Sequence, residues 1–184
     1  MNHLCATLLL FCSSFNMSFD DERNDFVEMI GRCAVEYNAY YTENENRIPI
    51  HLVVAVASHE SGWGTSRFAI EGNNYFGIKS VNDDPDQFMI PKENKEVKIQ
   101  RYLVPCDSVY DFMDLISMSK KYEGFQHELW NQWFNDETNL ESLVYSLPRY
   151  SKDKNWEKNV LRIIRQLEVE WLTIKKTLYH LKNQ

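Results

Sequence analysis

Hydrophobic and polar positions recur with two different periods along this chain. Over residues 20–42 and 49–60, apolar side chains return every three to four residues, which is the spacing of one face of an α-helix. From residue 97 to 103, apolar and polar side chains alternate one by one, as in a half-buried strand, and residues 87–90 supply a partner strand across a turn at 91–95. The pattern predicts an α+β, mainly α, domain with one small β-hairpin.

Further helices are predicted after the hairpin. Residues 108–111 and 138–141 have the spacing of capping boxes, so we expect helices to begin there. Residues 122–130 are rich in aromatic side chains and are expected to be helical in their second half. A long final helix is expected over residues 156–178, where apolar side chains again recur at helical spacing.

Composition limits the class of protein. With 184 residues, of which 43% are hydrophobic and 14% aromatic, the chain can form one domain with a sizeable core. The net charge is −7 and Lys and Arg form no stripe, which argues against a nucleic-acid partner. No apolar run is long enough to span a bilayer, and no cysteine or histidine spacing suggests a metal site. We expect a monomer without cofactor or metal.

The N-terminus carries a candidate export signal. Residues 4–12 have the length of the apolar region of a signal peptide, although no Lys or Arg precedes them. We expect a cleaved signal over residues 1–16, and hence a periplasmic or secreted protein. The alternative is a true start at Met17, which would leave the protein cytoplasmic before any export. The domain is then expected over residues 17–170, with a helical extension at 171–184.

The chain has four cysteines, Cys5, Cys12, Cys33 and Cys106. The first two would leave with a signal peptide. Free cysteine commonly packs as a small hydrophobic residue. We therefore expect Cys33 and Cys106 to be free thiols in the core. Trp130 and Trp133 share one helical face, and we expect them to pack inside as well.

Glu60 is the candidate for chemistry. It lies seven positions after Val53 and three after Ala57, so it continues the apolar face of the helix at 49–60 and should turn inward. Burial, the helix C-terminus and the nearby rings of Trp63 and Phe76 would raise its pKa. A carboxylic acid protonated near neutral pH suits the general acid of glycosidic cleavage. The alternative is an ordinary solvated glutamate at a helix end.

Three strings of residues resemble one enzyme family. They are HESGWGTSRFA at 59–69 with NNYFG at 73–77, IQRY at 99–102, and LPRYS at 147–151. Together they resemble the bacterial peptidoglycan-hydrolysing β-N-acetylglucosaminidases, and most of all the Bax-type branch. The resemblance implies a lysozyme-like helical domain with a small β-hairpin lobe beside the active-site cleft. It also implies cleavage of the β-1,4 bond between N-acetylglucosamine and N-acetylmuramic acid in peptidoglycan.

The same resemblance assigns roles to residues. Glu60 matches the general acid, and Tyr150 matches an active-site tyrosine. Residues that match the wall of the cleft are Trp63, Asn74, Tyr75, Phe76 and Tyr102. Glu93 and Glu96 on the hairpin are candidates for a second carboxylate, which leaves a retaining or an inverting outcome open. Two other functions remain: a muramidase or lytic transglycosylase on the same fold, and a catalytically silent wall-binding scaffold.

Overall fold

The computed structural model describes residues 19–40, 43–147 and 153–182, with the backbone alone for residues 19, 20, 44 and 170–182. The described chain is mainly helical, with one two-stranded antiparallel hairpin, as the sequence predicts. The helices are α1 (Phe19–Tyr40), α2 (Ile50–Ser61), α3 (Arg67–Gly72), α4 (Pro105–Met118), α5 (Glu123–Phe134), α6 (Leu140–Ser146) and α7 (Trp156–Lys182); the strands are β1 (Phe88–Met89) and β2 (Ile99–Gln100).

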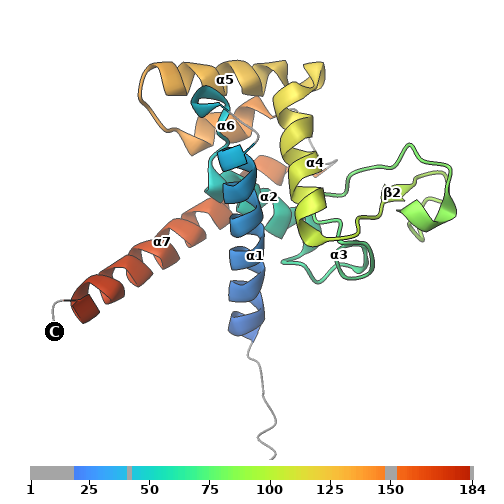
Figure 1. Ribbon diagram of the computed structural model, residues 1–184, viewed down its shortest axis with the longest axis horizontal. Helices are drawn as coiled ribbons and strands as arrows, with labels where there is room; N and C mark the ends of the chain where they lie inside the picture. The colour runs from blue at the N-terminus through green and yellow to red at the C-terminus, as the bar shows by residue number, and fades with distance from the viewer. Residues whose placement is uncertain (1–18, 41–42, 148–152, 183–184) are drawn as a thin grey trace, which may run out of the picture.

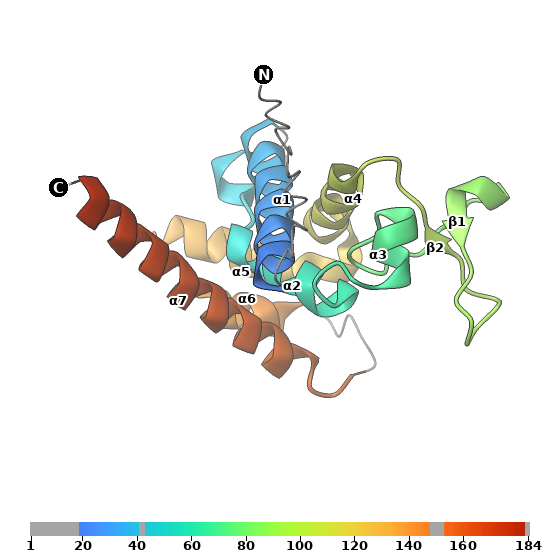
Figure 2. The same cartoon turned by 90° about the horizontal axis from the view of Figure 1, so that it is seen from below.

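Helix α2 lies at the centre of the helical body (Figures 1 and 2). Residues 52–58 are all buried, because the helix is apolar nearly all round and is covered by α1 and α7. Its two buried serines do not break the core: the Ser58 hydroxyl donates to the Val54 carbonyl at 2.7 Å, and Ser61 donates to Ala57 at 2.6 Å. This packing fixes the position of the C-terminal end of α2.

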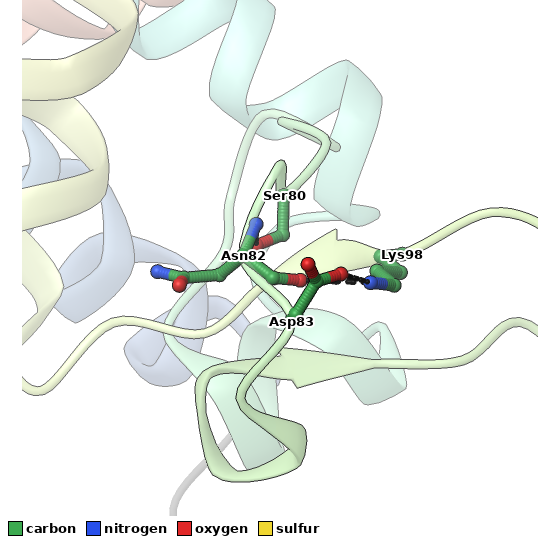
Figure 3. A network of polar contacts seen from close by, with 4 residues as sticks. All are labelled: Ser80, Asn82, Asp83 and Lys98. Carbon is green, nitrogen blue, oxygen red and sulfur yellow. Dashed lines mark hydrogen bonds and ion pairs between the residues drawn. The ribbon is translucent and has the colours of Figure 1, made fainter.

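The hairpin forms a separate small lobe beyond α3, on the opposite side of the body from the far end of α7 (Figures 1 and 2). Phe88 pairs with Gln100 and Met89 with Ile99, so the strands are shorter than the alternation predicts. Lys98 holds the segment before β1 against β2 (Figure 3). Its ammonium donates to the Asp83 carboxylate at 2.6 Å and to the Asn82 carbonyl at 2.9 Å.

Of the two helix starts predicted from capping boxes, one differs in the structure. Helix α4 begins at Pro105, one turn before the expected start at Ser108, because proline is favoured at the first helical position and lacks only a donor that would be unpaired there. Ser108 is consequently buried inside the helix. Helix α6 begins as predicted, with the Asn139 side chain accepting from the Ser142 amide at 3.0 Å.

Cys33 and Cys106 form a disulfide, so the expectation of two free thiols is wrong. Helices α1 and α4 pack along each other and bring the two Cα atoms to 5.2 Å, although the residues are 73 positions apart in sequence. That separation suits a disulfide. The bond ties the helical body to the helix that follows the hairpin.

The prediction for the tryptophans of α5 is also wrong. Trp130 and Trp133 are 45% and 49% exposed, and Phe134, stacked on Trp130, is 67% exposed. The buried face of the helix is formed instead by Phe125 and Leu129. Helical spacing correctly placed the two tryptophans on one side of the helix, but it could not tell which side faces the core.

Helix α7 runs on to Lys182, and its C-terminal half projects away from the body (Figures 1 and 2). Among the described helices, none combines the length and the apolar character that crossing a membrane requires. The expected signal peptide at 1–16 lies outside the described residues, and so does Tyr150.

Candidate active site

Glu60 lies in the last turn of α2, where a left-handed glycine ends the helix. Gly62 has φ 59°, a conformation that costs a residue with a side chain more than it costs glycine. The Ser61 hydroxyl accepts from the Gly64 amide at 2.8 Å and so closes the turn. The helix therefore ends at Ser61, one residue beyond the predicted end at residue 60.

The Glu60 carboxyl is half-buried and bonded to a tryptophan from the other end of the chain. The indole Nε1 of Trp156 donates to Glu60 Oε1 at 2.6 Å, across 96 residues of sequence. Trp156 is fully buried in the first turn of α7. The helical spacing predicted the inward orientation of Glu60, but its partner was expected among Trp63 and Phe76 and is Trp156 instead.

Burial raises the pKa of Glu60 above its ordinary value, since the ionised form loses its water. The bond from Trp156 and the charge of His59 act in the opposite direction, and the negative charge of Asp153 raises the pKa further. The expected contribution of burial is thus confirmed. The balance favours a carboxyl group that keeps its proton to a higher pH than an exposed glutamate does.

This raised pKa makes a prediction about stability. Below the ordinary Glu pKa, Glu60 is neutral in both the folded and the unfolded chain; as pH rises through the higher pKa of the folded state, stability is lost. Glu60→Gln removes this loss. We expect the variant to gain unfolding free energy relative to wild type between pH 4 and pH 8, measured by urea denaturation.

The exposed carboxylate Glu141 provides the control for that comparison. Glu141→Gln makes the same chemical change on the surface, and we do not expect it to reproduce the gain seen for Glu60→Gln as pH rises. A difference between Glu60→Gln and wild type that does not change with pH would contradict a raised pKa at position 60.

Trp63 and Tyr75 line a groove of about 470 Å³ together with residues of α1. The Arg23 guanidinium covers the Trp63 ring at 3.8 Å, and Tyr75, only 7% exposed, packs edge-on against Phe26. Helix α1 thus forms one side of this groove as well as packing on the core. Glu60 is not one of the described residues that line it.

Asn74 and Phe76 have structural roles. The Asn74 amide donates to the carbonyls of Ile78 and Gln100, both at 2.9 Å, and its oxygen accepts from the amides of Phe76 and Ile78. The side-chain nitrogen and oxygen of Asn74 therefore both form hydrogen bonds that join the loop to the hairpin lobe. Phe76 is fully buried and stacks on Phe112 with ring centres 4.2 Å apart. Neither side chain is placed to contact a sugar.

The remaining predicted residues belong to the hairpin lobe and the segment that leaves it. The Tyr102 hydroxyl donates to the Asp111 carboxylate at 2.5 Å, which links the end of the hairpin to α4. Glu93 and Glu96 are exposed in the turn between the strands, and no described contact joins either one to Glu60. The carboxylate that acts on Glu60 is Asp153, in the turn before α7. Sequence reasoning missed it, although it lies only three residues after Tyr150.

Solved structures show which class of fold this is. The chain is similar to the glycoside hydrolase domain of Salmonella typhimurium FlgJ, with a TM-score of 0.61 and 20% identity over 88% of this chain and 99% of that one. It is also similar to the catalytic domain of the autolysin Auto from Listeria monocytogenes (TM-score 0.58, 17% identity, 81% and 86% covered). A third match is a peptidoglycan hydrolase from Sphingomonas sp. A1 (TM-score 0.57, 20% identity, 76% and 86% covered). At these identities the likeness establishes the fold.

The family follows from the sequence itself. Residues 37–169 match the profile of the glucosaminidase family, described as mannosyl-glycoprotein endo-beta-N-acetylglucosaminidase. The match spans most of the chain, from the end of α1 into α7, and the chain belongs to this family. A search of curated proteins found no significant sequence match to this chain.

Proposed function

We propose that this protein is a peptidoglycan hydrolase that cleaves the β-1,4 bond between N-acetylglucosamine and N-acetylmuramic acid, with Glu60 as general acid. The observation that carries the proposal is the half-buried Glu60 carboxyl at the end of α2, which accepts a hydrogen bond from Trp156. It occurs in a chain that belongs to the glucosaminidase family. The similar solved structures, a glycoside hydrolase domain, an autolysin and a peptidoglycan hydrolase, support peptidoglycan as the substrate. Within the family, we place the chain in the Bax-type branch on its three sequence strings.

Cleavage begins with proton transfer. Burial raises the pKa of Glu60 and so favours its protonated form, whose proton passes to the oxygen of the glycosidic bond as the bond to the sugar carbon breaks. Positive charge then develops on the sugar ring, in the oxocarbenium-like transition state common to these reactions. The deprotonated Glu60 keeps the hydrogen bond from Trp156, which stabilises a carboxylate more than a neutral acid.

A second group must complete the hydrolysis by assisting water or the sugar. Tyr150 is our proposal for a residue that stabilises the charged ring or positions the N-acetyl group. Glu93 and Glu96 are exposed on the hairpin turn and would have to approach the cleft when substrate binds. Attack by the 2-acetamido group of the substrate itself needs neither of them.

Product analysis tests the bond that is cleaved. Purified peptidoglycan is digested with the protein, and the fragments are reduced and analysed by mass spectrometry. We expect reduced N-acetylglucosamine at the new chain ends. N-acetylmuramic acid at the new ends, in its reduced or its anhydro form, would identify a muramidase or a lytic transglycosylase. The absence of any fragments would indicate a silent scaffold.

The place of action follows from the substrate and from the disulfide. Structural disulfides persist in oxidising compartments, and Cys33–Cys106 supports export through the predicted signal at residues 1–16. We therefore propose a periplasmic or secreted enzyme that acts as a monomer. Fractionation of cells that express the full chain tests where the protein is located. N-terminal sequencing of the recovered protein tests whether the signal peptide is removed.

A further inference from the structure

The turn that leads into α7 is built to hold one side chain against the acid. Trp156 is fully buried, and its indole Nε1 lies 2.6 Å from Glu60 Oε1. The edge of the same indole meets the ring of His59, with ring centres 6.4 Å apart and planes at 77°. The indole of Trp156 thus contacts two neighbouring residues of α2, Glu60 and His59, which fix its position.

Asp153 fixes the turn from the other side. Its carboxylate accepts from the Asn155 amide at 2.9 Å and from the side-chain amide of Asn159 at 3.2 Å, while its carbonyl accepts from the Trp156 amide at 3.2 Å. One aspartate therefore ties together the turn, the first helical residue and the next turn of α7. This arrangement leaves Trp156 little freedom to rotate away from Glu60.

The chemistry of indole determines where the proton of the acid can lie. The indole nitrogen is a donor and never an acceptor. Both oxygens of a neutral carboxyl can accept a hydrogen bond, but the carbonyl oxygen is the better acceptor, so the contact favours the acidic proton on the other oxygen of Glu60.

We propose that Asp153 and Trp156 form a positioning device for the acid: Asp153 holds the turn, and Trp156 binds one oxygen of Glu60 so that the other presents its proton to the substrate. The inference rests on the proposed function and names two positioning residues for it, neither of which has to contact the glycan. Among the described residues, the ionisable groups that act on Glu60 are Asp153, from the turn before α7, and His59, from α2.

The two residues act on the charge of Glu60 with opposite sign. The indole bond favours the ionised carboxyl, whereas the negative charge of Asp153 disfavours it. Removing each one alone therefore has opposite consequences. Trp156→Phe should raise the pKa of Glu60, and Asp153→Asn, which keeps an oxygen to accept from the Asn155 amide, should lower it.

The experiment follows the Glu60 carboxyl by carbon-13 NMR titration in the full chain, alongside the pH profile of kcat on peptidoglycan. We expect the titration midpoint and the high-pH limb of activity to move up in Trp156→Phe and down in Asp153→Asn. In Trp156→Phe, kcat should fall about 10- to 100-fold with KM little changed, because a misaligned acid costs rate rather than binding.

Two exposed positions provide matched controls. Trp133→Phe on α5 and Glu168→Gln on α7 make the same kinds of chemical change away from Glu60, and we expect neither the midpoint nor the profile to move. Midpoints that stay fixed in both test variants, or move in the same direction, overturn the proposal. Loss of packing alone has no reason to shift the two midpoints in opposite directions.

One further readout keeps the inference testable when a variant does not fold. If Trp156→Phe does not fold, the indole N–H resonance of Trp156 in the wild-type protein carries the test: it should titrate with the same midpoint as Glu60, and a resonance that is constant with pH contradicts the contact. The titrations need no turnover. An inactive wild type would therefore refute the proposed function, while the opposite midpoint shifts would still decide the positioning role.

Discussion

Glu60→Gln should lose about 10²- to 10⁴-fold in kcat on peptidoglycan while the protein stays folded. Glutamine keeps the size of the side chain and an oxygen that accepts from the Trp156 indole, so the site should keep its shape. What it lacks is a proton that it can give to the leaving oxygen. The measurement is the rate of solubilisation of labelled peptidoglycan by equal concentrations of the two proteins.

Circular dichroism and thermal unfolding of both proteins provide the control for folding. Glu141→Gln, an exposed carboxylate on α6, should clear peptidoglycan at the wild-type rate. Equal clearing by wild type and Glu60→Gln would remove Glu60 from the mechanism, whatever the products are.

Reducing the Cys33–Cys106 disulfide should produce the largest change in stability. The bond closes a loop with a sequence separation of 73 residues, for which the chain-entropy relation gives about 4 kcal/mol of unfolding free energy. We expect a large fall in the urea midpoint when reductant is added to a variant in which Cys5 and Cys12 are replaced by serine. That background removes the two other thiols from the comparison.

The matched control is the same background with Cys33→Ala and Cys106→Ala, whose urea midpoint should not respond to reductant. Thiol titration of the unreduced, denatured protein should find no free thiol in the first variant. Two free thiols, together with a midpoint that reductant leaves unchanged, would contradict the disulfide.

Features set by neighbouring residues could be predicted from the sequence. The inward orientation of Glu60 follows from its spacing to Val53 and Ala57, and the end of α2 follows from Gly62. The hairpin follows from the alternation at 97–103, although only the pairs formed by Met89 and Phe88 are regular strand. In each case, the residues that determine the feature are close together in sequence, within two helical turns or one strand.

Features set by packing between distant segments could not be predicted. Trp156 meets Glu60 across 96 residues, because α7 packs on α2, and Cys33 meets Cys106 because α4 packs on α1. No local pattern encodes which helices become neighbours. The same limit explains Trp130, whose helical face was correct but whose exposure depends on what covers that face.

The candidate site shows a similar division. The resemblance drew attention to the residues around Glu60, but it gave Asn74 the role of a sugar contact. In the structure, all the hydrogen bonds of its amide serve the junction of loop and hairpin. A buried amide and a sugar-binding amide look alike in sequence, and only the positions of the surrounding carbonyls distinguish them.

The central claim is that Glu60 donates a proton to the leaving oxygen, and a substrate whose leaving group needs no proton tests it most directly. The rates of wild type and Glu60→Gln are compared on peptidoglycan and on a dinitrophenyl glycoside of an N-acetylglucosamine oligomer. We predict the full loss of about 10²- to 10⁴-fold on peptidoglycan and a much smaller loss on the dinitrophenyl glycoside. An equal loss on both substrates would contradict a general acid at position 60.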